Sequence, residues 1–427
     1  MLFCLVFARL VFHAILVPVW EGPDEPFHLA RIASYADQPF WEAVLAAGDL
    51  PDPIAASIRA HPCGPDLQRA FRCPGFSGHT AAFNVFRASA AAPSAGSAWA
   101  NPENNQPPLH YLVVGLLLRQ GEAMSRSRWK PETRLLFGRL FSLLLITLAI
   151  LGPLRALAGG LSAGGRIGAL LLLLLPGFSE ALVRCSNDAA VFLWCALALF
   201  ALEHGRPGWP CTLLLALGPL IKLTAFPVVA VVLLNLWRRG QIRAAVRGAL
   251  GTLTVFPVQA LLRGWSWGGT YELNRPTTPI NESLLTSVVG IVRSAYTFLK
   301  TVFWLGEWSF FRPPRVLVLV YFVLIAAWLV RCRLKVPRQD LVSHLAGAGV
   351  AVAGFLVFAV ANRRLFGVWG GVGGWYFWTW FPWLLVAARD IVDFSSGRKS
   401  LVVAASLLFL LLANLSWFET AFGIYGV

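Results

Sequence analysis

Long apolar runs recur along the whole chain, and they constrain its fold more than any other feature. Each run is about 15 to 23 residues long, which at ~1.5 Å rise per residue matches a hydrocarbon layer of ~30 Å. Because 57% of the 427 residues are hydrophobic and only 13% are charged, the chain is far more apolar than one soluble core requires. The alternating pattern of barrel strands is absent, so we expect an all-α bundle of transmembrane helices.

We predict about eleven spans in a single membrane domain over residues 1–427, with the N-terminus inside. The spans are 2–20, 135–156, 166–182, 188–204, 209–221, 224–237, 245–263, 315–330, 341–360, 375–388 and 400–417. This order places every short basic loop inside, in agreement with the positive-inside rule. The net charge of +15 is therefore interpreted as setting topology, and no nucleic-acid partner is expected.

Two long segments face outward in this topology, residues 21–134 and 264–314. The stretch "NNQPPLHYLVVGLLLRQ" in the first has an apolar part too short to span, so it is expected to be a juxtamembrane helix lying in the outer interface. A mixed apolar and basic stretch in the second segment has helical spacing and is expected to lie there too.

A cysteine pair lies in the first outer segment, within "HPCGPDLQRAFRCPG". A disulfide between Cys63 and Cys73 fits an oxidising compartment and would contribute on the order of 2 to 3 kcal/mol. Two free thiols are the alternative. The nearby His61 and His79 leave a metal site open, although their spacing matches no recognised motif.

The stretch "EGPDEPFHLARI" breaks the apolar pattern directly after the first span. One interpretation is structural: Asp24 caps a helix, and Glu25 interacts with the positive end of its dipole. The other is functional, because Asp24, His28 and Arg31 would share one helix face at the outer membrane surface. A carboxylate held against an apolar wall suits general-base work, since desolvation raises its pKa.

Other polar residues fall at the same predicted outer level, in separate turns of the chain. Taken singly, each is explained as a snorkelling, turn or interfacial residue. Taken together, they would form a pocket for an anionic lipid headgroup, because a departing phosphate needs fixed positive charge. The substrate-binding candidates are His28, Arg184, Asp188, Lys222, Arg363, Arg364 and Tyr376, the last within the aromatic stretch "GVWGGVGGWYFWTWFPW".

Four motifs in order, "GPDEPFHL", "NQPPLHYLVVG", "SNDAAVF" and "IKLTAFP", resemble the GT-C superfamily of polytopic glycosyltransferases. The likeness covers about the first 240 residues. It is to the uncharacterised bacterial membrane-protein branch that is related to polyprenyl-phosphate-sugar mannosyl and aminoarabinose transferases. Two departures stand out: His110 replaces the usual tyrosine, and Gly374-Trp375-Tyr376 lacks the arginine of the late Gly-Arg-Tyr-like motif.

The resemblance implies an inverting transferase with a polyprenyl-phosphate-linked sugar as donor and a glycan, lipid or protein as acceptor. It also implies a multi-pass protein of the bacterial cytoplasmic (inner) membrane whose active site faces the periplasm. By motif position, Asp24 would be the catalytic base with Glu25 supporting it, and Lys222 would bind the donor phosphate. Asp188 would orient the acceptor, or hold a divalent metal where one is used; no other cofactor is implied.

Two other functions compete with this one. A polysaccharide polymerase or ligase would use the same lipid carriers and place its key arginines in the second outer segment, at Arg275, Arg293 and Arg312. A lipid-linked-glycan transporter would need ionisable residues near mid-span, where only Arg9 and His13 are candidates. The absence of a Rossmann fingerprint and a P-loop argues against a nucleotide-sugar donor on a cytosolic domain.

Overall fold

The protein is helical throughout the part of the chain that a computed structural model describes. A single pair of two-residue strands, β1 (Arg333–Leu334) and β2 (Val392–Asp393), pairs antiparallel. The described residues are 2–22, 24–45, 50–61, 101, 106–205, 209–258, 284–304, 313–331, 333–334, 338–366, 369, 373–393 and 400–425.

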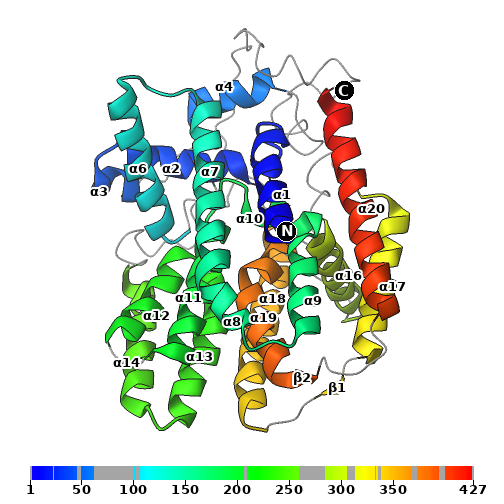
Figure 1. The fold of residues 1–427 in the computed structure, drawn as a ribbon. Coiled ribbons are helices and arrows are strands. Elements are labelled where there is room, and N and C mark those ends of the chain that lie inside the picture. The colour runs from blue at the N-terminus through cyan, green and yellow to red at the C-terminus, as the bar shows by residue number, and fades with distance from the viewer. Residues whose placement is uncertain are drawn as a thin grey trace.

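The helices divide between a bundle and a smaller group at one end of it (Figure 1). The end group holds α2 (Glu25–Asp37), α3 (Phe40–Leu45), α4 (Asp52–Ala60) and α6 (Leu109–Ser125). The bundle holds α1 (Leu2–Leu16), α7 (Pro131–Ala149), a π-helical turn η3 (Ile150–Leu154), α8 (Arg155–Ala158), α9 (Ala163–Leu173), α10 (Pro176–Leu182), α11 (Asp188–His204), α12 (Trp209–Ile221), a 3-10 turn η4 (Leu223–Ala225), α13 (Phe226–Arg238), α14 (Ile242–Leu253), α16 (Leu284–Phe303), α17 (Arg315–Arg331), α18 (Arg338–Phe366), α19 (Trp375–Ile391) and α20 (Ser400–Tyr425).

The two ends of the molecule carry different elements of the chain. Figure 1 shows α2, α3 and α4 at one end and the β1–β2 pair at the other, with α7 running from the first end down to α8. The turn between α13 and α14 also lies at the β1–β2 end (Figure 1). The predicted outer segment and these predicted inner turns therefore occupy opposite ends.

Membrane-spanning capacity is shown for part of the predicted set. Three helical stretches in the described residues are long and apolar enough to cross a membrane, Pro131–Ala158, Leu341–Val360 and Val403–Ala421. A bent pair, Gly165–Leu173 with Pro176–Leu182, makes up to four. Shorter apolar helices occupy four more of the predicted positions, so the chain is all-α with membrane-capable helices, and the count of eleven stays a prediction.

The predicted span 166–182 is bent by 61° between α9 and α10. Pro176 explains the bend, because its ring removes a backbone N–H and holds the preceding Leu175 in extended conformation (ψ 138°). The side chain of Asn414 on α20 donates a 3.0 Å hydrogen bond to the Leu174 carbonyl at the break. Because of this bend, the residues that follow α10 do not continue along the axis of α9.

Candidate functional site

Helix α2 is held rigidly at both ends by arginines of α7. At its start, the fully buried Glu25 carboxylate accepts hydrogen bonds from Arg139 at 2.8 Å and 2.5 Å. It also accepts hydrogen bonds from the backbone N–H groups of Gly22 and Cys185. At the other end, Arg134 makes a two-pronged bond to Asp37, both at 2.9 Å. These ties fix the helix that carries Asp24 and His28.

Glycine allows α2 to approach α6 closely. A Cβ added at Gly115 of α6 would lie 2.6 Å from the Cβ of Tyr35 and 2.9 Å from the carbonyl oxygen of Ile32. The backbones of the two helices therefore pack together without a side chain between them. This contact packs the end of "NQPPLHYLVVG" against α2 just beyond "GPDEPFHL", and the two stretches meet directly where His28 bonds Tyr111.

Asp24 occupies the N-cap position of α2 but does not act as a cap. Its φ of 59° and ψ of 6° are left-handed, and its side chain makes no capping hydrogen bond. A non-glycine residue in this region costs of order 1 kcal/mol or more and persists only when surrounding structure imposes it. The interpretation of Asp24 as a helix cap is therefore not supported. Its carboxylate needs another role.

A compact ion cluster joins the end of α10, the start of α11 and the end of α12. Asp188, fully buried, accepts a 2.6 Å bond from Lys222 on one oxygen and a 2.5 Å bond from Arg184 on the other. Ser186 donates to the same carboxylate at 3.1 Å. Two cations thus share one carboxylate, leaving the trio with a net positive charge.

Two aromatic rings from the start of α19 cover this cluster. The Arg184 guanidinium carbon lies 5.2 Å from the Trp375 ring centroid, and the Lys222 ammonium lies 5.5 Å from that of Tyr376. Both distances are within the range of cation–π attraction. Arg184, from a distant part of the chain, thus lies beside Trp375 of the Gly374-Trp375-Tyr376 stretch.

Asp24 lies within electrostatic reach of this cluster. Burial raises the pKa of its carboxyl above the usual value, the positive charges of Arg184 and Lys222 act in the opposite direction, and the negative charge of Asp188 adds to the rise. The balance favours proton uptake compared with an exposed aspartate. The structure therefore brings Asp24, Arg184, Asp188 and Lys222 together, although they are up to 198 residues apart in sequence.

Two neutral histidines lie within electrostatic reach of the ion cluster. His28 Nδ1 and the Tyr111 hydroxyl are 2.8 Å apart, and their rings stack at 5.9 Å. Burial and the charge of Arg184 hold the pKa of His28 well below its usual range, and burial lowers that of His110 to about 3. Both imidazoles are therefore uncharged at neutral pH and add neutral polar groups near the ion cluster.

Arg31 is bonded to α3 and to Tyr35 of its own helix, and none of the bonds described here joins it to Asp24 or His28. Its guanidinium instead donates to the Ala43 carbonyl at 2.7 Å and contacts the Tyr35 hydroxyl at 3.2 Å. Ala43 lies near the end of α3. Its carbonyl has no partner within that helix, because α3 has no further turn to supply an N–H group. Arg31 thus fixes α3 against α2.

Several predicted site residues are not placed in the cluster. Arg363 lies near the end of α18 and is partly buried, and none of the cluster contacts described above involves it. The side chain of Arg364 and both Cys63 and Cys73 fall outside the described residues, as do Arg275 and Arg312. Arg293 is exposed on α16. Arg9 and His13 are buried on α1, beside the Trp417 ring of α20.

Sequence reasoning missed two residues that shape the site, Arg139 and Trp375. Arg139 interrupts an apolar run, and a charge inside a predicted span is a signal of a buried partner. Its partner Glu25 could not be identified, because the two are 114 residues apart. Trp375 was noted only as a departure from a motif, and the sequence has no local signal for its contact with Arg184.

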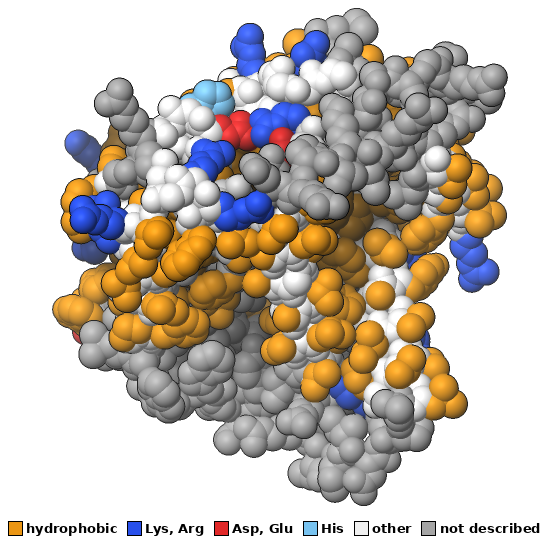
Figure 2. Space-filling model, turned by 90° about the horizontal axis from the view of Figure 1, so that it is seen from below, with side chains coloured by type: hydrophobic (Ala, Val, Ile, Leu, Met, Phe, Trp, Pro, Cys, Tyr) orange, Lys and Arg blue, Asp and Glu red, His pale blue; other side chains and the backbone are white. Residues whose placement is uncertain are grey.

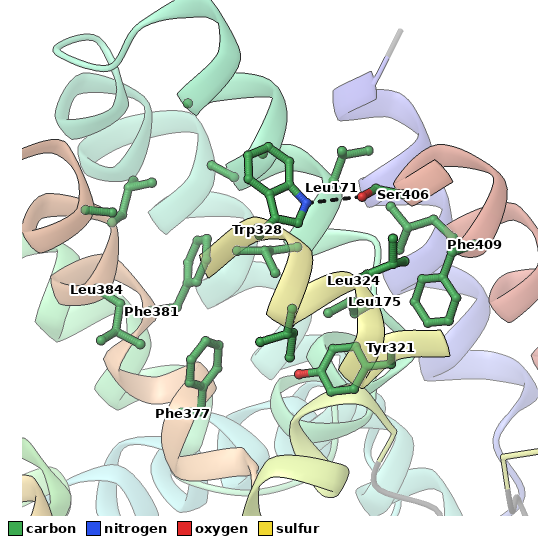
Figure 3. Close-up of a pocket in the computed structure, with 18 of the residues that line it drawn as sticks. Leu171, Leu175, Tyr321, Leu324, Trp328, Phe377, Phe381, Leu384, Ser406 and Phe409 are labelled. Carbon is green, nitrogen blue, oxygen red and sulfur yellow. Dashed lines mark hydrogen bonds between the residues drawn. The ribbon is translucent and has the colours of Figure 1, made fainter. Parts of the chain in front are cut away.

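An apolar cavity of about 380 Å³ lies between α9, α17, α19 and α20. Figure 3 shows Phe377 and Phe381 of α19 on one side of it, with Tyr321 and Trp328 of α17 opposite. The Trp328 indole N–H donates to Ser406 at 3.2 Å, so one of the few polar groups in the wall is already bonded. Because α19 also carries Trp375 and Tyr376, this helix links the cavity to the ion cluster.

No group of three or more His, Cys, Asp and Glu side chains in the described ranges is placed to hold a metal ion. Comparison of the chain with protein-family models, with curated proteins and with solved structures finds no match. The assignment of the candidate site therefore rests on the geometry described above.

Proposed function

We propose that this protein is a membrane glycosyltransferase that moves a sugar from a polyprenyl-phosphate donor to an extracytoplasmic acceptor. The observation that carries the proposal is the Asp24 carboxylate, held in a strained backbone position without a capping bond, within reach of Arg184 and Lys222. An acid with a raised pKa beside fixed cations provides a base and an anion site in one place. Transfer of a phosphate-linked group to a hydroxyl needs both.

In the proposed step, the acceptor hydroxyl attacks the anomeric carbon and its proton passes to Asp24. The bond between that carbon and the phosphate oxygen breaks, and the electron pair leaves with the phosphate. Arg184 and Lys222 stabilise the charge gained by the departing phosphate. Direct displacement inverts the anomeric centre. Asp188 keeps the two cations in place, and Glu25 holds the helix that carries the base.

The lipid part of the donor is proposed to lie along α19, with the isoprenoid chain in the apolar cavity and the phosphate at the ion cluster. The cavity wall is aliphatic and aromatic, which suits a hydrocarbon chain. The eleven-span topology with the N-terminus inside is part of the same proposal. It places the ion cluster on the periplasmic side of the bacterial inner membrane.

Donor binding can be tested without knowing the sugar. The full chain is purified in neutral detergent and titrated with undecaprenyl phosphate, and binding is followed by native mass spectrometry. We expect Lys222→Met to weaken binding at least tenfold, since one fixed charge next to the phosphate is lost. Lys130→Met is the matched control, because Lys130 is exposed in the turn before α7. Equal affinity in the Lys222 variant would contradict the assignment.

The base is tested by sugar transfer. Purified protein is used, because inverted membrane vesicles would expose the opposite face. The donor is undecaprenyl phosphate carrying radiolabelled hexose or aminosugar. Extracted envelope glycans and lipids are the acceptors. Asp24→Asn is expected to lower the rate about 10²- to 10⁴-fold with donor binding kept. Transfer at the parental rate would refute the role. If Arg293→Gln proved more damaging than Asp24→Asn, the polymerase or ligase alternative would be favoured.

A further inference from the structure

A second surface with a distinct chemistry lies far from Asp24, where α13 turns into α14. We call it the α13–α14 corner. It comprises Trp209, Trp237, Arg238, Arg239, Arg243 and Arg247. Gly240 makes the tight turn in the left-handed region, at φ +72°. Arg239 donates a 2.8 Å bond to the Leu202 carbonyl, which anchors the corner to the end of α11.

Helix α14 has one face packed inward and one facing out. Small residues pack inward: a Cβ added at Gly248 would lie 2.8 Å from a methyl of Leu215 on α12, and Thr252 is buried. The outward row is aliphatic, and each of its members is about half exposed: Ile242, Val246, Leu250 and Leu253. This row has the character of a lipid-facing surface.

Arginines and tryptophans lie at the beginning of this aliphatic row. Arg243 is exposed, and Trp209 and Trp237 are 71% and 56% exposed. The guanidinium carbon of Arg247 is 5.5 Å from the Trp209 ring centroid. Indole rings beside cationic side chains, next to an aliphatic face, are typical of the headgroup level of a bilayer.

Basic residues outnumber acidic ones in the sequence around this corner. The segment from residue 204 to residue 271 contains neither Asp nor Glu. Glu203 just before it is already bonded to Arg389, at 2.8 Å and 2.5 Å. Figure 2, which views the β1–β2 end, shows more Lys and Arg side chains on the half where Figure 1 places α12 to α14 than on the other half, with a few Asp and Glu side chains among them. The stretch from residue 204 to residue 271 therefore carries a net positive charge, which favours an anionic partner.

We propose that the α13–α14 corner binds the headgroup phosphate of an anionic phospholipid. Arg243 and Arg247 contact the phosphate oxygens, the indole rings lie at the ester level, and an acyl chain runs along the outward row of α14. Arg matches phosphate through paired N–H groups, and each cation near the surface favours an anionic headgroup. The inference is independent of the glycosyltransferase proposal, since it uses neither the ion cluster nor the cavity.

The test measures lipid preference of the delipidated full-length protein in neutral detergent by native mass spectrometry. Dioleoylphosphatidylglycerol is compared with dioleoylphosphatidylcholine, which has the same chains. We expect at least tenfold tighter binding of the anionic lipid, lost in Arg243→Gln/Arg247→Gln and kept in Arg243→Lys/Arg247→Lys. The matched control is Arg119→Gln/Arg126→Gln, which removes the same charge from the exposed surface of α6 and the turn after it.

Each contrary result would overturn the proposal. Equal binding of the two lipids by the parent would show that the corner does not select charge. An equal loss of lipid binding in the control variant would show that the net charge of the protein, and not this surface, determines the lipid preference. Displacement of the lipid by equimolar inorganic phosphate would show a site for free phosphate. Unchanged thermal unfolding of the glutamine variant, read by tryptophan fluorescence, establishes that a loss of binding is not a loss of fold.

Discussion

Replacing Glu25 by glutamine should destabilise the protein by about 3 to 5 kcal/mol, the usual cost of removing one partner of a buried ion pair. The carboxylate is fully buried and accepts four N–H groups, two from Arg139 and two from the backbone of Gly22 and Cys185. The glutamine amide would place its NH2 group against N–H donors that the carboxylate oxygen now accepts. It would also leave the Arg139 charge without its partner.

The corresponding shift in melting temperature follows from chain size. Unfolding entropy is about 2.1 cal/mol/K per residue, so for 427 residues each kcal/mol corresponds to about 1 °C. We therefore expect Glu25→Gln to melt about 3 to 6 °C below the parent in detergent, followed by tryptophan fluorescence. Glu42→Gln, on the exposed surface of α3, is the matched control and should melt within about 1 °C of the parent.

The sign of the pH dependence adds a second test. Burial would raise the pKa of Glu25, but the charge and hydrogen bonds of Arg139 outweigh it and hold that pKa below the usual value. A lowered folded pKa gives stability that is present above the unfolded pKa of about 4.3 and is lost as the pH falls through the folded pKa. The difference between parent and Glu25→Gln should thus shrink in acid.

A double variant decides whether the two side chains act as a pair. Glu25→Gln/Arg139→Gln removes the uncompensated charge as well, and should be more stable than the sum of the single losses predicts. If Glu25→Gln melted with the parent, or if the two single losses simply added, the buried pair would not be what fixes the start of α2.

Three further outcomes are expected. Gly177→Ala should melt well below the parent, because its Cβ would lie 2.3 Å from a backbone carbonyl of α16, whereas Gly168→Ala, with open space at its Cβ, should be neutral or slightly stabilising; equal melting of the two would contradict this. Transfer activity should rise with pH through a raised Asp24 pKa, and a pH-rate profile without that limb would argue against it as base. Asn414→Leu should cost about 1 to 3 kcal/mol, measured by thermal unfolding, because the Leu174 carbonyl at the α9–α10 break loses its side-chain donor; unchanged stability would show that another group satisfies it.

Helix positions were readable from the sequence where an apolar run has clear ends. The runs 188–204 and 209–221 became α11 and α12 with those same limits. The predicted span 166–182 is apolar enough to cross a membrane but is bent by 61°, and the hydrophobic pattern gave no sign of this bend at Pro176. Hydropathy measures how apolar a segment is and carries little information about where its backbone bends.

The sequence alone determined which residues are chemically exceptional, since a charged group in an apolar chain is costly wherever it lies. It singled out Asp24, Glu25, Asp188 and Lys222 for that reason. Only the tertiary structure decided what each one does. Glu25 became the buried partner of Arg139 on α7, while its neighbour Asp24 came within electrostatic reach of Arg184 and Lys222, which lie just after α10 and α12. Such partners are chosen by packing between segments remote in sequence, and local pattern does not encode that choice.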